Sequence, residues 1–235
     1  VPLPSYQYYW KIRANPLEPV PGAWSEDIFS FSITPVQLEV PGSGATVSSL
    51  TPEFSWDGPE GVGGFEFRIS SAEDAQVENP TFIQTVTSNS FTYPGDAQGL
   101  APGGSYSWKV IALDQNENYL GSAEDYLDIY SFSVEPVALS SPAEGSSVSS
   151  LTPVFSWEAP SGVPSFEFQM FLGENSSAES PDYFVKVNSN SYQLNASEFL
   201  LEEGSSYFWK VVALDGDEIM MGDVHGLVSN GSKSL

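Results

Sequence analysis

Few residues in this chain could support catalysis or metal binding. His225 is the single histidine and there is no cysteine, so His225 has no partner Cys or second His, and neither a metal ligand set nor a catalytic triad built on it is expected. Residues 114–118 (DQNEN) place oxygen ligands at alternate positions, as the start of a calcium loop does, but Tyr119 stands where such a loop needs glycine. The related segment that starts at Asp215 breaks the spacing as well. We therefore expect no catalytic, cofactor-binding or metal-binding residues, and only weak calcium binding.

The charge balance narrows the classes of partner. The 235 residues carry 31 acidic side chains against 7 lysines and arginines, for a formal net charge of −24. Nucleic acid and anionic membrane surfaces both attract basic residues, so neither is an expected partner. No apolar run approaches the ~18 residues that insertion into a membrane as a helix requires. With so many acids some pair of carboxylates fits any spacing, so such pairs do not indicate a glycosidase, and we expect no enzyme activity.

Three asparagines lie in N-x-S sequons and are candidate N-glycosylation sites: Asn175, Asn195 and Asn230. Their number does not exceed what a chain this rich in serine and threonine produces by chance, so they matter only if the protein is secreted. The lack of cysteine excludes disulfides without fixing the compartment.

The chain repeats itself with a period of 101 residues. SSLTPEFSW at 48–56 returns as SSLTPVFSW at 149–157, YSWKVIALD at 106–114 returns as YFWKVVALD at 207–215, and DIFSFSITP at 27–35 returns as DIYSFSVEP at 128–136. A third copy of the second phrase, YYWKIRA, lies at 8–14. A period of this length suits a small sandwich domain. Residues 1–35 are thus expected to be the last third of a unit, followed by fuller units at 36–135 and 136–235.

Within each unit, polar and apolar residues alternate as they do in half-buried strands. One face of residues 106–112 collects Tyr106, Trp108, Val110 and Ala112, which leaves Ser107, Lys109 and Ile111 on the opposite face. Glu66 and Glu167 are repeat-equivalent and are expected on a solvated face. Glycine- and proline-rich turns separate these runs, and no convincing amphipathic helix is present, so the pattern predicts an all-β sandwich fold.

Aromatic residues recur at equivalent places in the units, and we expect them to form the cores rather than to stack on sugars. These expected core residues are Trp10, Trp56, Trp108, Trp157, Trp209, Tyr106 and Tyr207. Trp24 is the one tryptophan without a counterpart.

The recurring motifs resemble those of fibronectin type III-like domains, especially the divergent kind found in prokaryotic secreted and surface proteins. They are Pro-x-Phe-x-Trp at 52–56 and 153–157, then Leu-x-Pro-Gly-x-x-Tyr at 100–106, then Tyr-x-Trp-x-Val-x-Ala. The second full unit keeps Leu201, Gly204 and Tyr207 but lacks the proline. The resemblance covers essentially the whole chain. It implies that Trp56 and Trp157 lie on the second strand and that Tyr106 and Tyr207 form tyrosine corners.

The joins between units are short. Residues 33–36 (ITPV) and 134–137 (VEPV) lead from the last strand of one unit into the first strand of the next, so we expect the sandwiches to form a semi-rigid rod. Such repetition supplies reach and surface rather than an active site. The expected function is that of a non-catalytic extracellular structural protein, a subunit or segment of a surface filament, stalk or sheath. The alternative is an adhesin, or a carbohydrate-associated binding or spacer module of a larger secreted protein, with surface glycans or proteins as partners.

The two ends of the chain do not match. Residues 1–35 carry strand-like stretches without the rest of a sandwich, and residues 227–235 (LVSNGSKSL) lack the aromatic alternation expected of a closing strand. An open sheet edge can accept a strand from another chain. One hypothesis is that Phe29, Phe31 and Ile33 form a donor strand for the last unit of another copy, in head-to-tail assembly. The other is that residues 1–35 are the cut end of a longer repeat chain.

Overall fold

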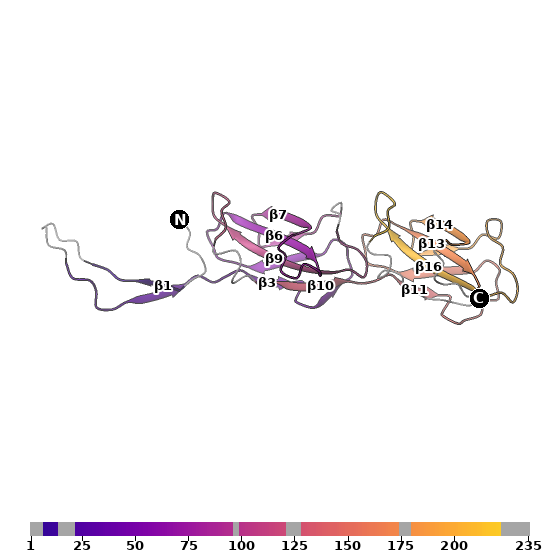
Figure 1. Cartoon of the computed structure of the whole chain (residues 1–235), viewed down its shortest axis with the longest axis horizontal. Coiled ribbons are helices and arrows are strands. Elements are labelled where there is room, and N and C mark those ends of the chain that lie inside the picture. Colours follow the sequence, from indigo (N-terminus) through magenta and orange to yellow (C-terminus); the bar gives the residue numbers. More distant parts are fainter. Residues whose placement is uncertain (1–6, 14–21, 96–98, 121–127, 174–179, 222–235) are drawn as a thin grey trace.

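The computed structural model describes residues 7–13, 22–95, 99–120, 128–173 and 180–221. These residues form sixteen strands and no helix, which confirms the predicted all-β fold. Accordingly, the described part of the chain offers no helix of the length and apolarity needed to cross a membrane. In Figure 1 a two-stranded hairpin and two sandwiches follow one another along the long axis of the molecule.

The first sandwich packs a three-stranded sheet against a five-stranded sheet. The former has the order β3 (Gln37–Val40), β5 (Glu53–Asp57), β8 (Ser90–Thr92), and the latter the order β4 (Ala45–Val47), β10 (Tyr130–Val134), β9 (Ser105–Leu113), β6 (Gly64–Ser71), β7 (Phe82–Val86). Apolar side chains from the two inner faces meet in one core. Its centre is aromatic: the Phe54 ring lies 4.7 Å from Phe67 and 5.0 Å from Trp108, between ring centroids.

The second sandwich repeats this plan with fewer strands. One sheet has the order β11 (Ala138–Ser141), β12 (Val154–Glu158), β15 (Ser191–Gln193), and the other β14 (Tyr183–Val187), β13 (Ser165–Leu172), β16 (Tyr207–Leu214). Strand β16 is the counterpart of β9. Within the described residues, nothing corresponds to β4 or β10, so β16 pairs with β13 on one edge and with no strand on the other.

The aromatic residues that were expected in the cores of the two sandwiches are buried there. Trp56, Trp108, Trp157 and Trp209 are at most 3% exposed. Trp56 and Trp157 stand on β5 and β12, the second strands of the three-stranded sheets. The tyrosine corners that the resemblance implies are also present, since the Tyr106 hydroxyl accepts a hydrogen bond from the Ala101 amide and the Tyr207 hydroxyl one from the Glu202 amide, both at 2.9 Å.

The expectation that Trp10 is a core residue is wrong. Trp10 lies on β1 (Gln7–Trp10), which pairs only with β2 (Phe29–Ser32), and its side chain is 47% exposed. The side chains of a two-stranded hairpin are buried only when another sheet packs on the hairpin. None of the described residues forms such a sheet here. Trp10 instead stacks on Phe29 of the neighbouring strand, with ring centroids 5.3 Å apart.

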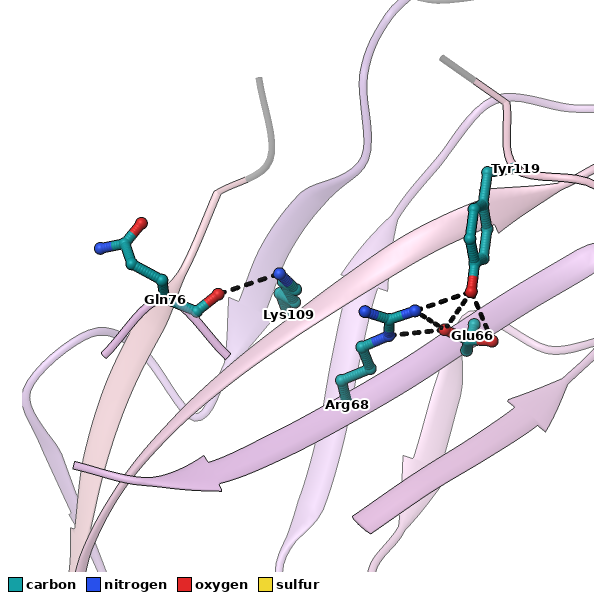
Figure 2. A network of polar contacts seen from close by, with 5 residues as sticks. All are labelled: Glu66, Arg68, Gln76, Lys109 and Tyr119. Atoms are coloured by element: carbon teal, nitrogen blue, oxygen red, sulfur yellow. Dashed lines mark hydrogen bonds and ion pairs between the residues drawn. The ribbon is translucent and has the colours of Figure 1, made fainter. Parts of the chain in front are cut away.

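The outer face of β9 is also more covered than alternation predicts. Ser107, Lys109 and Ile111 are all buried. The loop after β6 folds over this face: Val77 is fully buried, and the Lys109 ammonium donates to the Gln76 carbonyl at 2.9 Å, as Figure 2 shows. A period-2 pattern predicts the strand correctly, but it does not predict that a loop distant in the sequence covers the polar face of that strand.

Glu66 does not lie on an open solvated face either. Figure 2 shows its carboxylate held by Arg68, in an ion pair of 2.5 Å, and by the Tyr119 hydroxyl at 3.2 Å. The Glu66 side chain is 16% exposed, because Tyr119 from the loop that follows β9 lies against it. Its equivalent Glu167 is likewise half-buried.

Candidate functional site

The two loops considered for calcium use their carboxylates to form turns. One oxygen of Asp114 accepts hydrogen bonds from the amides of Asn116 (2.7 Å) and Asn118 (2.9 Å), and the Asn118 bond above all lowers the pKa of Asp114. Asp215 repeats this geometry with Asp217 and Ile219. Among the residues that the structure describes, no group of three or more His, Asp or Glu side chains could hold a metal ion.

The candidate glycosylation sites fall mostly outside what the structure describes. Asn195 is exposed on a turn, where its side-chain oxygen accepts from the Ser197 amide at 3.1 Å. Asn175, Asn230 and His225 lie outside the described residues, as does the segment 227–235. Among the described residues, the candidate metal and glycosylation positions therefore form no functional site. The exposed faces and edges of the strands are the remaining candidates.

The most unusual surface is the aromatic face of the β1–β2 hairpin. Tyr8 stacks on Phe31 at 5.3 Å, next to the Trp10–Phe29 pair at the same distance. Phe29 and Phe31 remain 54% and 44% exposed, and Ile33 is half-buried. Burying such rings in a sandwich core would stabilise them by roughly 1.5–3 kcal/mol each. The hairpin thus presents, uncovered, the kind of face that both sandwiches bury.

The pairing of this hairpin copies a pairing inside the first sandwich. Phe31 lies opposite Tyr8 and Phe29 opposite Trp10 in the hairpin. In the first sandwich Phe132 lies opposite Tyr106 and Tyr130 opposite Trp108, 101 or 98 positions further along the chain. Strand β2 is therefore the counterpart of β10, but it is not part of a sandwich core. Phe132 on β10 is 2% exposed, whereas its equivalent Phe31 on β2 is 44% exposed.

The second sandwich presents the complementary feature. Tyr207 and Trp209 of β16 are the equivalents of Tyr106 and Trp108, and they are paired with β13 in the same way that β9 is paired with β6. The edge that β10 occupies on β9 has no occupant on β16 within the described residues. In Figure 1 the second sandwich lies at the end of the molecule opposite to the hairpin.

The two sandwiches meet at a junction built from backbone hydrogen bonds. The Leu50 amide donates to the Ser161 carbonyl at 2.9 Å, and the Ser161 amide donates to the Ser48 carbonyl at 2.8 Å. Leu50 is 6% exposed there, and Val163 and Met221 of the second sandwich pack against the cores of both. A cleft of about 700 Å³ opens beside this contact, lined by residues of the first sandwich such as Leu100 and Tyr106 and of the second such as Ile219 and Met220.

Sequence reasoning pointed to β2 but missed the junction. The signal for the junction was present in the phrase SSL, which recurs at 48–50 and 149–151, directly before the repeated motif of each core strand. Its serines and leucine gave no periodicity that distinguishes an interface from a turn.

The strand order, the buried tryptophans and the two tyrosine corners define a pair of fibronectin type III-like sandwiches with an additional hairpin. No protein-family model matches the sequence, and no curated protein matches it significantly.

Three solved structures show the level of similarity to known folds. The chicken CNTN1 FN1-FN3 domains match with 16% identity and a TM-score of 0.27, over 89% of this chain and 71% of that one. The Clostridium thermocellum CbhA fibronectin(III)-like modules match with 13% identity and a TM-score of 0.28, over 80% of this chain and 89% of that one. The BSP domain of a biofilm associated protein matches with 17% identity and a TM-score of 0.27, over 80% and 30%. At TM-scores this low, the matches carry no information on function.

Proposed function

We propose that this chain is a non-catalytic structural segment of an extracellular filament, stalk or sheath built from tandem sandwiches. The observation that carries the proposal is the junction, in which two backbone hydrogen bonds join the sandwiches directly. A contact made by backbone atoms in both directions holds orientation better than side-chain contacts alone, because few rotatable bonds lie between the two bodies.

The link between the sandwiches supports the same function. Val134 at the end of β10 and Val137 before β11 are each 1% exposed, in the cores of the first and second sandwich. Only Glu135 and Pro136 lie between them, and the Glu135 amide is itself bonded to the Val47 carbonyl at 2.9 Å. A two-residue link fixed at both ends and stiffened by proline allows little bending.

A second candidate function, a binding or spacer module within a larger secreted protein, draws on the hairpin. Trp24 is 50% exposed there, with the charged groups of Lys11 and Arg13 4.9 and 4.8 Å from its ring. A flat aromatic flanked by cations is a surface that can bind a glycan or protein ligand. Substituting Trp24→Ala and measuring binding to surface glycans separates this function from a purely structural one.

Small-angle scattering of the whole chain tests the structural function. The two sandwiches are expected to give one elongated particle whose maximum dimension does not change with salt. A variant with a flexible Gly-Ser insertion between Glu135 and Pro136, and the variant Ser161→Pro, which removes one junction donor, are expected to broaden the distance distribution. A wild-type chain as broadly distributed as the insertion variant would contradict the proposal.

A further inference from the structure

We infer that Tyr183 and Tyr192 are an oxidative modification site, at which the two phenols couple to dityrosine and so join the two sheets of the second sandwich covalently. The oxidant is hydrogen peroxide, used through a haem peroxidase that removes one electron at a time. The inference goes beyond the proposed structural function and does not depend on it, because it concerns one sandwich alone.

The two phenols meet between the sheets. Tyr183 lies on β14 and Tyr192 on β15, and these strands belong to different sheets of the sandwich. Their hydroxyl oxygens are 2.6 Å apart, and their rings are stacked at an angle of 27° with centroids 6.3 Å apart. In dityrosine the new bond joins the ring carbons next to those that carry the hydroxyls. Contact between the hydroxyls therefore brings the carbons that must react close to one another.

Packing holds both rings in this arrangement. Tyr183 and Tyr192 are partly buried against the core of the second sandwich. The Tyr183 ring contacts Phe199, with centroids 5.4 Å apart, and the Tyr192 ring contacts Phe168, with centroids 5.1 Å apart. Two groups that are already held side by side lose little entropy when a bond forms between them, so their coupling is favoured over coupling of exposed tyrosines that meet by diffusion.

A carboxylate lies where it can accept the protons that the oxidation releases. Glu198 Oε2 accepts from the Tyr183 hydroxyl at 2.8 Å and from the Tyr192 hydroxyl at 3.1 Å. The amides of Glu198 and Phe199 both donate to the Asn195 carbonyl, at 2.9 Å and 3.1 Å, so a turn after β15 holds this carboxylate in place. A base within hydrogen-bond reach of a phenol can take its proton as the phenol is oxidised.

Both phenols carry their protons at neutral pH. Burial, followed by the hydrogen bond with Tyr192, raises the pKa of Tyr183, and burial likewise raises the pKa of Tyr192. Each ring must therefore lose a proton together with its electron. The radical cation of a phenol is a far stronger acid than the phenol itself, so the proton passes to Glu198, which is exposed and returns it to solvent.

The coupling balances with one molecule of peroxide. Each phenol gives one electron to the peroxidase and its hydroxyl proton to the carboxylate, which leaves two phenoxyl radicals. The radicals form one bond between ring carbons. Each of these carbons then loses its hydrogen as a proton, and each phenol oxygen regains a proton, so both rings are aromatic again. The two electrons and two protons that are removed overall break the O–O bond of hydrogen peroxide and reduce it to two water molecules.

The first sandwich has the same packing without this chemistry. Phe82 and Phe91 are the repeat-equivalents of Tyr183 and Tyr192, and their rings are stacked with centroids 5.9 Å apart. Packing at this place therefore needs only the rings, and the paired hydroxyls with their carboxylate are particular to the second sandwich. The chain contains no cysteine, so a bond between aromatic rings supplies the covalent tie between sheets that a disulfide supplies in other sandwiches.

Oxidation of the whole chain tests the site. Treatment with a haem peroxidase and hydrogen peroxide is expected to produce dityrosine fluorescence in the monomer fraction, with a mass loss of two hydrogen atoms. Lys186 lies between the two tyrosines, so trypsin separates them unless they are coupled. Mass spectrometry of the digest should therefore find residues 110–186 joined to residues 187–210.

The variants Tyr183→Phe and Tyr192→Phe copy the first sandwich, and circular dichroism verifies that they fold. Each should lower the yield of the joined peptides by at least roughly tenfold, because one of the two phenols is gone. The matched control is Tyr119→Phe. Tyr119 is exposed and lies in the same tryptic peptide as Tyr183, but its hydroxyl contacts Arg68 and Glu66. Its substitution should leave the yield unchanged.

Two measurements test the parts of the mechanism. Glu198→Gln keeps a hydrogen-bond acceptor but removes the base, so it should slow the coupling roughly tenfold without changing which peptides are joined. The coupled wild type should unfold at a higher urea concentration than before oxidation, because the bond constrains the unfolded chain. Oxidised Tyr192→Phe should show no such shift.

Joined peptides that persist in Tyr183→Phe would overturn the inference, because other tyrosines would then be coupling. Dityrosine that appears only in covalent dimers would overturn it too, as would its absence from the monomer while free tyrosine in the same mixture couples. An unchanged rate in Glu198→Gln would contradict the role of the carboxylate as the base. None of these outcomes bears on the proposed structural function, which is tested by scattering of the chain before oxidation.

Discussion

The two sandwiches share a core and differ at their edges. Phe54 and Phe155 are both fully buried, as are Phe67 and Phe168, and the paired tryptophans differ by no more than 2% in exposure. The first sandwich has β4 and β10 on one sheet and the second sandwich on its end, whereas the described part of the second has neither. The comparison teaches that a repeated sequence can specify a core twice while leaving different surfaces for association.

The hairpin sharpens this comparison, because it keeps the residues of a core without the sheets that bury them. The largest expected effect contrasts Trp108→Ala with Trp10→Ala. Trp108 is fully buried and contacts Phe54, so its truncation should reduce the free energy of unfolding by roughly 3–5 kcal/mol. Trp10→Ala should cost less than about 1 kcal/mol, since exposed side chains contribute little.

Chemical denaturation of the two variants under conditions where the chain is monomeric measures this difference. Equal losses would mean that Trp10 is buried in solution by a partner or by other parts of the chain. In that case the distinction between hairpin and sandwich would fail.

The junction provides the next contrast, between Leu50→Ala and Leu151→Ala. Leu50 is buried against the second sandwich, and its truncation should cost roughly 2–3 kcal/mol. Leu151 is half exposed, so Leu151→Ala should stay within about 0.5 kcal/mol of wild type in the monomer. Urea titration of both variants, followed by tryptophan fluorescence, decides; a large loss for Leu151→Ala in dilute solution would show that its end is covered without a second copy.

The core of each sandwich could be predicted from the sequence because strand periodicity and repetition act on the same residues. Phe54, Trp56 and Trp108 alternate with polar neighbours and return one period later, so each observation checks the other. Burial that depends on segments distant in the chain could not be predicted in this way. Lys109 is covered by the loop that contains Val77, and Trp10 is exposed because no sheet among the described residues packs on its hairpin.

The candidate interface was predictable only in part. The alternation of Phe29, Phe31 and Ile33 identified β2 as the counterpart of β10, because that match is a matter of sequence. The junction depends on backbone amides of Leu50 and Ser161, and every residue except proline carries such an amide. Only a structure can show which amides face a neighbouring domain.

A smaller effect follows from a core position where the two sandwiches differ in chemistry. Tyr93 occupies in the first sandwich the place that Leu194 takes in the second, and both are 1% exposed. Burial raises the pKa of Tyr93 to about 12, from an ordinary value of 10.0. The folded state therefore favours the neutral phenol, so its contribution is complete below pH 10 and is lost as the pH rises from about 10 towards 12.

The fall in stability over this window is expected to be at most about 1.4 kcal/mol per pH unit for this group. Tyr93→Leu, which copies the second sandwich, should flatten the pH dependence, while the exposed control Tyr9→Leu should leave it unchanged. Unfolding by urea at several pH values between 9 and 12 measures the slopes. An unchanged slope for Tyr93→Leu would assign the alkaline loss to other tyrosines.

The smallest effect concerns the loops that begin at Asp114, after β9, and at Asp215, after β16. Each carboxylate accepts two backbone amides from its own loop, and the Asn118 side chain adds contacts to Asp114 at 3.1 and 3.2 Å that Ile219 cannot supply to Asp215. A carboxylate oxygen that accepts amides points its lone pairs into the loop, and calcium needs six or more oxygen ligands at once. Calorimetry should therefore show no saturable calcium binding tighter than about 1 mM, and Asp114→Asn should not change the heats. If a stoichiometric site appears and disappears with Asp114→Asn but persists with Asp215→Asn, the two loops are not equivalent, and the first sandwich would differ from the second in ion binding as well as in its edges.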